Sequence, residues 1–163
     1  MRQLERMAGV LLLVALAGCA SEVSIGTAYD PLAVFPSQGA FAWSNSPNVI
    51  SKQVAHLGLA DLIPPAVEGA LASRGWRKVG PDAADVLVSY ELSVATWVQV
   101  ATPDADERSL AMGTLSVALL DPENERRLWV GFIQADVTPS LSHEERQARI
   151  EKALERLFKE FPP

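Results

Sequence analysis

The chain has 163 residues, 48% of them hydrophobic, and a formal net charge of −6. This length suits one domain with a single core. An acidic chain is poorly suited to bind nucleic acid or an anionic membrane surface through its own charges, so we expect no nucleic-acid partner. Cys19 is the only cysteine, which excludes a disulfide within the chain and leaves packing to supply the stability.

The first 18 residues have the pattern of a secretory signal peptide. Arg2 and Arg6 precede the apolar run Val10–Leu16, which is too short to span a bilayer. Small residues then lead to the cysteine, and the stretch reads Leu16, Ala17, Gly18, Cys19. The pattern predicts cleavage between Gly18 and Cys19, so residues 1–18 take no part in the fold.

This arrangement resembles the lipobox of bacterial lipoproteins, in which the cysteine thiol takes a diacylglyceryl group and the new amino terminus is acylated. The resemblance implies a membrane anchor of palmitate-like chains on Cys19, made and sorted by the lipoprotein machinery. Ala20, and not aspartate, follows the cysteine. The resemblance therefore implies the outer membrane, with the domain in the periplasm. The other interpretation of Cys19 is a small buried hydrophobic residue.

Residues 19–28 are small and polar, which predicts a flexible tether, with a single domain over residues 29–163. We expect short extended segments at Leu32–Phe35 and Gly39–Trp43. Strand alternation places Phe41 and Trp43 on one face of the second segment.

The first predicted helix begins near Asp61, a suitable N-cap residue. Pro64 and Pro65 fall in its first turn, where a missing N–H costs little. Gly75 is placed to end the helix in the left-handed conformation, and Trp76 is placed to make the apolar contact that follows such an end.

Three long strands are predicted next, at Val86–Ala101, Met112–Leu120 and Arg127–Val137. Short polar turns join them, which indicates an antiparallel meander. The first strand exceeds the usual length, so we expect a bulge or bend within it. Gly113 and Gly131 stand alone inside strands and indicate bulges or points of close packing.

The last helix has the clearest start signal, because Ser142 and Glu145 have the spacing of a capping box. Its apolar stripe comprises Ile150, Ala153, Leu154, Leu157, Phe158 and Phe161. We expect an α/β (α+β) fold: a two-layer sandwich with a mostly antiparallel sheet and two helices packed on one face.

No catalytic pattern is visible in the sequence, so we expect a protein without enzymatic activity, cofactor or metal. His56 and His143 have no ligand partners at metal-binding spacing. The acidic segment Asp104–Glu107 lacks the remaining ligands of a calcium loop. No serine stands in a nucleophile-elbow motif, and no glycine-rich phosphate loop is present.

The order of several short segments resembles a family of bacterial lipoproteins known as domain of unknown function 4136. The resemblance extends from about Tyr29 to Pro163. It implies a secreted, lipid-anchored α/β domain with no assigned reaction and no catalytic residues. The matching segments are Phe41–Trp43, Arg74–Trp76, Ala84–Tyr90, Gly113–Val117, Asp121, Leu128–Gly131 and Phe161–Pro163.

Our leading functional hypothesis is a lipid-anchored envelope lipoprotein whose non-catalytic domain binds or scaffolds an envelope protein. The last strand is apolar on both faces, so an exposed face around Trp97, Leu128 and Phe132 is the candidate interface. Alternatively, a loop around Asn48–Val54 covers that face. The alternative function is a carrier of a small molecule or lipid, with an apolar pocket between sheet and helices. An undetected hydrolase ranks last.

Overall fold

The computed structural model describes residues 23–52, 54–99, 108–159 and 161, with the backbone alone for residues 97–99 and 108–110. The predicted signal peptide, the lipobox, the first part of the tether and the polar turn at 102–107 lie outside these residues.

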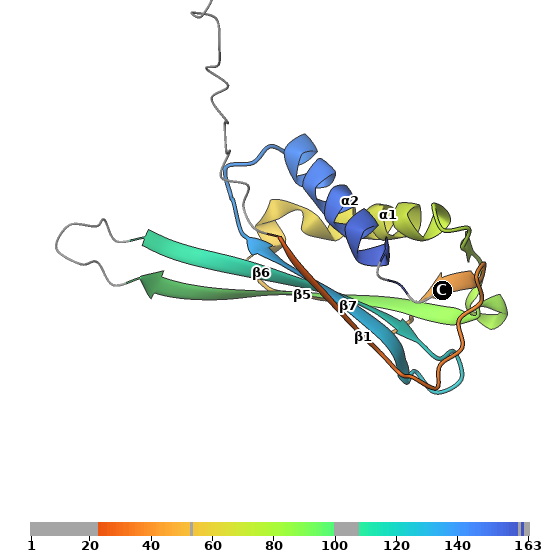
Figure 1. Ribbon diagram of the computed structural model, residues 1–163. Coiled ribbons are helices and arrows are strands. Elements are labelled where there is room, and N and C mark those ends of the chain that lie inside the picture. Colours follow the sequence, from red (N-terminus) through yellow and green to blue (C-terminus); the bar gives the residue numbers. More distant parts are fainter. Residues whose placement is uncertain (1–22, 53, 100–107, 160, 162–163) are drawn as a thin grey trace, which may run out of the picture.

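A seven-stranded sheet forms the body of the domain, in the order β1-β7-β6-β5-β2-β4, with β3 also paired to β5. Its long strands come from the second half of the chain, and its short strands from the first half (Figure 1). The strands are β1 (Ser24–Tyr29), β2 (Ala40–Trp43), β3 (Val49–Ile50), β4 (Arg77–Lys78), β5 (Val86–Gln99), β6 (Arg108–Leu120) and β7 (Arg127–Asp136).

The direction of pairing divides the sheet. β5, β6 and β7 form the predicted antiparallel meander, and β1 adds to β7, also antiparallel. The three shortest strands pair in parallel: β2 with β5 and β4, and β3 with β5. The sheet is therefore mixed, and the prediction of a mostly antiparallel sheet is confirmed only for β1 and the three long strands.

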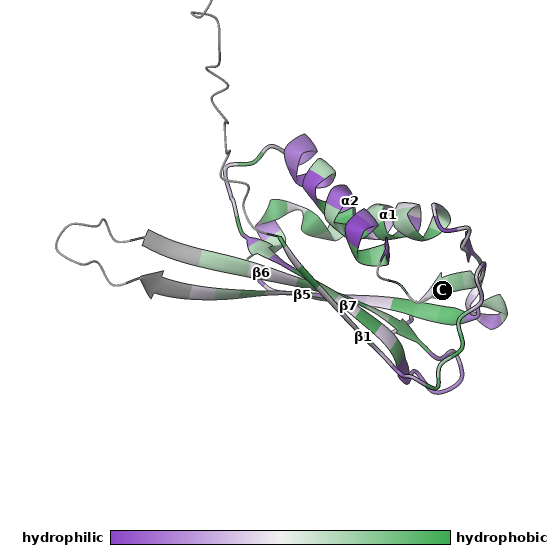
Figure 2. Ribbon diagram, viewed as in Figure 1, coloured by the Kyte–Doolittle hydropathy of each residue, from purple (hydrophilic) through white to green (hydrophobic). Residues whose placement is uncertain are grey.

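Two helices, α1 (Leu59–Ala72) and α2 (His143–Lys159), lie on the same side of the sheet and contact each other (Figure 1). Two short 3-10 helices, Ala55–Leu57 and Pro81–Ala83, precede α1 and β5. Hydrophilic residues gather along the outward side of α2, while the sheet beneath is largely hydrophobic (Figure 2). Burial of the apolar helix faces holds the helices on the sheet.

The helix ends follow local rules. Ser142 Oγ accepts from the Glu145 N–H at 3.2 Å and Glu145 Oε2 accepts from the Ser142 N–H at 2.8 Å, which confirms the capping box. At the end of α1, Gly75 has φ of +81° and the Trp76 N–H donates to the Leu71 carbonyl. This pattern is a Schellman motif, and it confirms the helix end predicted from the position of Gly75 in the sequence.

Three boundaries differ from the sequence prediction. Gly58 caps α1, and Asp61 lies in the first turn, because the chain turns into the helix directly from the preceding 3-10 helix. Ser24–Tyr29 pairs with β7, so the ordered domain begins before Tyr29 and the tether is shorter than 19–28. Leu32–Phe35 forms no strand, since it connects β1 to β2 across one end of the sheet.

The bulge in the sheet lies outside the strand in which the sequence predicts a bulge or bend. β5 pairs with β6 in continuous register from Leu87 to Gln99, so this pairing contains no bulge. The register shift occurs between β6 and β7 at Leu119 and Leu120, where Leu128 is the extra residue.

An aromatic cluster fills the core at one end of α2. Trp129 stacks on Phe158 with ring centroids 5.4 Å apart, and Phe161 meets Trp129, Trp76 and Phe35 edge-on. All five side chains are buried. This part of the core is dense, and aromatic pairs of such geometry add to the stability from area burial.

A recess between the helices and the sheet

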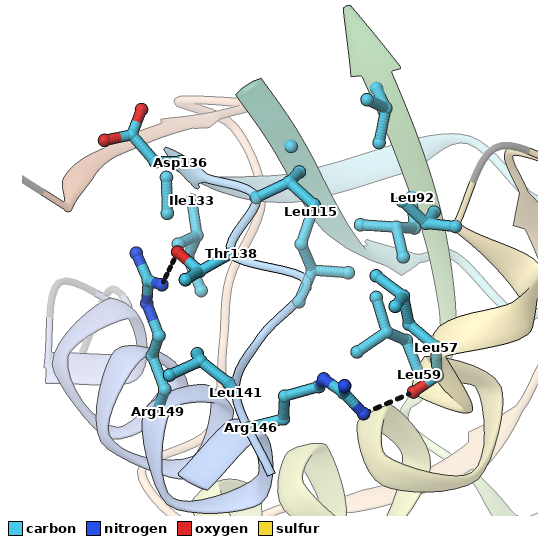
Figure 3. Close-up of a pocket in the computed structure, with 15 residues that line it drawn as sticks. Leu57, Leu59, Leu92, Leu115, Ile133, Asp136, Thr138, Leu141, Arg146 and Arg149 are labelled. Atoms are coloured by element: carbon cyan, nitrogen blue, oxygen red, sulfur yellow. Dashed lines mark hydrogen bonds between the residues drawn. The ribbon is translucent and has the colours of Figure 1, made fainter. Parts of the chain in front are cut away.

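An apolar recess of about 130 Å³ lies between the sheet and the start of α2, at the end of the sheet away from the aromatic cluster (Figure 3). β5 and β6 run on beyond the helices at this end (Figure 1). The apolar lining comprises Val54, Leu57, Leu59, Leu92, Val94, Gly113, Leu115, Ile133, Ala135, Val137 and Leu141.

Small side chains in one cross-strand row leave this space open. Val94 on β5, Gly113 on β6 and Ala135 on β7 are directly paired and share a face. The next row toward the core holds Leu92, Leu115 and Ile133, all buried. The glycine and the alanine thus remove the side chains that would otherwise fill the floor of the recess.

Two arginines of α2 close the recess from the helix side (Figure 3). Arg146 donates from Nη1 to the Leu57 carbonyl at 3.3 Å and from Nη2 to the Pro139 carbonyl at 3.2 Å. Arg149 donates from Nη1 to Thr138 Oγ1 at 3.3 Å. These neutral acceptors fix the guanidinium groups at the recess but leave their charge unbalanced.

Each arginine also holds a buried donor without an acceptor. Within the described residues, Arg146 Nε and Arg149 Nη2 are inaccessible to solvent and have no hydrogen-bond partner. A buried donor left unpaired costs about 1–3 kcal/mol, and more when the group is charged. Neither N–H group is exposed to the recess in this arrangement, so an acceptor there would reach them only after the guanidinium groups turn toward it. A third such donor, Trp129 Nε1, lies in the aromatic cluster instead.

No carboxylate neutralises this site within the described residues. Asp136 is the acidic residue of the lining, but it is exposed and points away from the recess (Figure 3). The ion pairs of the described chain are elsewhere, Lys78 with Glu68 and Arg126 with Asp30. The recess therefore combines an apolar interior with positive charge at one wall.

Glu68 and Tyr90, whose pKa values are shifted, also lie outside the recess. Burial raises the pKa of the Glu68 carboxyl, but hydrogen bonds from Lys78 and Trp43 outweigh it, so the net pKa is lowered. Trp43 Nε1 donates to Glu68 Oε1 at 2.7 Å, and the Lys78 ammonium lies 2.6 Å from the same oxygen. Burial, with the negative charge of Asp61, raises the pKa of Tyr90. These shifts reflect contacts between neighbouring elements.

The two candidate interface residues with described side chains, Leu128 and Phe132, differ in exposure. Phe132 is 38% exposed on the sheet face opposite the helices, and its ring covers Gly26 of β1, where a Cβ atom would lie 2.3 Å away. Leu128 is half-buried at the register shift and contacts the core. Strand register places Trp97 on the same sheet face as Phe132, but its side chain lies outside the described residues.

The alternative interpretation, in which the loop around Asn48–Val54 covers this face, is wrong. Val49–Ile50 pairs with β5, and Val54 lines the recess on the helix side. The segment therefore lies away from the outer face of β7, and Phe132 keeps its exposure.

Arg146 and Arg149 are not among the site residues predicted from the sequence, because charged residues on an amphipathic helix usually point to solvent. A signal was present: the two arginines are one turn apart and precede Ile150 of the apolar stripe. Arginines can lay their aliphatic stems along such a stripe while the guanidinium stays at its edge. Gly113 gave a second signal, as a missing side chain on the buried face.

Metal clusters and membrane-spanning helices are absent from the described part of the chain. Within it, no group of three or more His, Cys, Asp or Glu side chains is arranged to hold a metal ion. None of its described helices is both long and apolar enough to cross a membrane.

The sequence profile of one protein family, Domain of unknown function (DUF4136), matches residues 25–163. The chain belongs to this family. The match starts at Ile25, within β1, and so agrees with the early start of the ordered domain. No curated protein matches the chain significantly.

Two solved structures are similar to this chain at low sequence identity. A PDZ domain protein from Parabacteroides distasonis has a TM-score of 0.51 at 14% identity, and the match covers 88% of this chain and 37% of that one. The chain thus spans well under half of that protein, and this likeness concerns the fold alone. The PelC dodecamer from Paraburkholderia phytofirmans has a TM-score of 0.48 at 12% identity, with 82% and 98% of the two chains covered.

Proposed function

We propose that this member of the DUF4136 family is a lipid-anchored envelope protein whose domain binds a small apolar molecule without transforming it. The recess carries the proposal: it is built into the core, lined by apolar side chains, and bordered by two arginines. Its lining offers Thr138 and the outward-pointing Asp136, but no paired nucleophile and base. Such a site suits binding more than catalysis.

Filling the recess tests this proposal. The full chain, purified from envelopes in a maltoside detergent, is examined by native mass spectrometry for a bound small molecule. We expect wild type to carry one and Gly113→Leu to have lost it, because a leucine side chain there projects into the recess. Gly80→Leu is the matched control, since Gly80 is exposed with open space around it. Equal occupancy in all three proteins would contradict the proposal.

The anchor is proposed at Cys19, with the lipid in the outer membrane and the domain facing the periplasm. The lipobox-like stretch and the family membership support it. Cys19→Ala is expected to give an unprocessed precursor without lipid, because only a thiol accepts the diacylglyceryl group. Palmitate labelling and mass spectrometry measure this outcome, with Ser21→Ala as the control. A Cys19→Ala chain that is cut after Gly18 at the normal rate would refute the lipobox interpretation.

The destination is tested separately by membrane fractionation. Ala20 in place of aspartate supports export to the outer membrane, so we expect the protein mainly in that fraction. Recovery mainly with the inner membrane would contradict the proposed destination. Ala20→Asp is the positive control and should move the protein to the inner-membrane fraction.

A second candidate function is docking of an envelope protein on the sheet face opposite the helices. Exposure of Phe132, with half-buried Val130 beside it on the same face, favours this reading. Phe132→Asp should then reduce recovery of the partner after cross-linking of intact envelopes, whereas Gln134→Asp, two residues along the same face, should not. Unchanged recovery with Phe132→Asp removes this candidate.

A further inference from the structure

We propose that the recess binds the carboxylate of a single-chain aliphatic acid, with the head group on Arg146 and Arg149 and the tail along β5–β7. This inference rests on the proposed binding function and names its ligand class.

The charge selects an anion. Two guanidinium groups border the recess, and no described carboxylate pairs with either of them. Arg146 Nε and Arg149 Nη2 are buried donors without acceptors. A guanidinium presents N–H groups in a planar fork that fits a carboxylate with two hydrogen bonds. An anion at the rim would balance the positive charge, and a turn of each guanidinium group would bring its unpaired N–H to the anion.

The apolar interior selects the other end of the ligand. Leu92, Leu115 and Ile133 form the inner wall, and Val94, Gly113 and Ala135 form the floor next to it. An inorganic anion would leave these surfaces without a partner. A ligand with a carboxylate at one end and a hydrocarbon at the other fits both parts of the recess at once.

The volume limits the length of the tail. The recess measures about 130 Å³. An engineered cavity of about 150 Å³ in another protein holds one benzene molecule, so about six carbon atoms fit here. The two long chains of a phospholipid do not fit. The recess therefore suits a single short tail, of the size of hexanoate or octanoate, with the head group at the rim.

The position of the recess brings it near a membrane surface. Ser24 pairs with Gln134, the residue before Ala135 of the recess floor. Cys19 is five residues before Ser24. An extended chain covers at most about 3.6 Å per residue, so a lipid on Cys19 would lie within about 18 Å of this point. Aliphatic acids concentrate at such a surface, because their chains partition into the bilayer.

Equilibrium dialysis of labelled octanoate against the full chain in maltoside micelles tests the proposal, with protein-free micelles as the blank. We expect saturable binding above the blank, and octanol and inorganic phosphate to bind at least tenfold more weakly. Arg149→Gln should weaken octanoate about tenfold or more, because it removes a hydrogen bond to a charged group, and should leave octanol unchanged. Arg156→Gln, an exposed arginine on the same helix, is the control.

Arg149 is the better residue to substitute. Arg146 also donates hydrogen bonds to the Leu57 and Pro139 carbonyls, which a substitution there would remove. Arg149→Lys keeps the charge but loses the fork, so its octanoate affinity should fall between those of wild type and Arg149→Gln. Gly113→Leu should abolish the binding of octanoate and octanol alike. Circular dichroism confirms that each variant retains the fold.

The outcomes separate this inference from the proposed function. Equal affinity for octanol and octanoate would overturn the anion site, while the binding function would stand. Tighter saturable binding of hexadecanoate than of octanoate would overturn the size limit. Absence of any ligand from the recess, in dialysis and in native mass spectrometry, would overturn both.

Discussion

The two ends of the sheet differ in how tightly they are packed around a glycine on the same sheet face. We call the tightly packed end at Gly131 the closed end, and the end at Gly113, which borders the recess, the open end. At Gly131 on β7, an added Cβ atom would lie 2.4 Å from the Trp129 ring and 2.6 Å from Leu157 Cδ1. At Gly113 on β6, the nearest atom would be Val137 Cγ2, at an ordinary 3.4 Å. Both glycines lack a side chain on the helix-facing surface, but neighbouring groups fill the space only at Gly131.

The two glycines therefore have different surroundings. At Gly131, Trp129 and Leu157 occupy the space of the missing side chain. Gly113 borders the recess, where Val137 lies within ordinary contact distance but leaves room for a side chain. A glycine without a packing role inside a strand is a cost to stability, and its presence supports a role for the space itself.

We expect the largest loss of stability when a core side chain is removed at the closed end. Phe158→Ala removes a fully buried ring that stacks on Trp129 and should destabilise the domain by about 3–5 kcal/mol. Lys159→Ala, at the exposed next position, should leave the melting temperature nearly unchanged. Thermal unfolding followed by circular dichroism measures both. If the two variants melt together, α2 does not hold the core through this face.

A matched pair of substitutions tests the comparison directly. Gly131→Ala should cost about 1–3 kcal/mol, because Trp129 or Leu157 must move to admit the methyl group. Gly113→Ala should be neutral or should stabilise by about 0.5–1 kcal/mol, because alanine is better than glycine in a strand and the space is free. Chemical denaturation gives both values. Equal destabilisation at the two sites would refute the division into a closed and an open end.

The smallest expected effect on stability concerns the charge of Glu68. It compares a paired polar group with the unpaired donors at the recess. Glu68 is fully paired with Trp43 and Lys78, whereas Arg146 and Arg149 hold unpaired donors. Because the folded pKa of Glu68 lies below its ordinary value of 4.5, its charge stabilises the fold above that pH, and this stabilisation is lost as pH falls through the folded pKa.

Glu68→Gln should therefore destabilise the domain at pH 7, by less than about 1 kcal/mol because Lys78 is largely exposed. The difference from wild type should shrink as the pH falls below 4.5. Unfolding curves at several pH values measure it, with Glu155→Gln on the exposed side of α2 as the control. A difference that is the same at all pH values would show that the charge of Glu68 plays no part.

The sequence by itself determined the features that depend on near neighbours in the chain. The capping box of Ser142 and Glu145 and the helix end at Gly75 use residues within one or two turns. The meander of β5, β6 and β7 follows from alternation and short turns. The apolar stripe of α2 is periodic and long, so its burial was predictable as well.

Features that join distant parts of the chain follow only from the tertiary structure. Ser24–Tyr29 is short and has no clear alternation, and it becomes a strand because β7 offers it an edge. The parallel pairing of β2 with β5 depends on where α1 returns the chain. The recess depends on three strands and a helix at once, because the sheet register and the packing of α2 bring Gly113, Ala135 and Arg149 together.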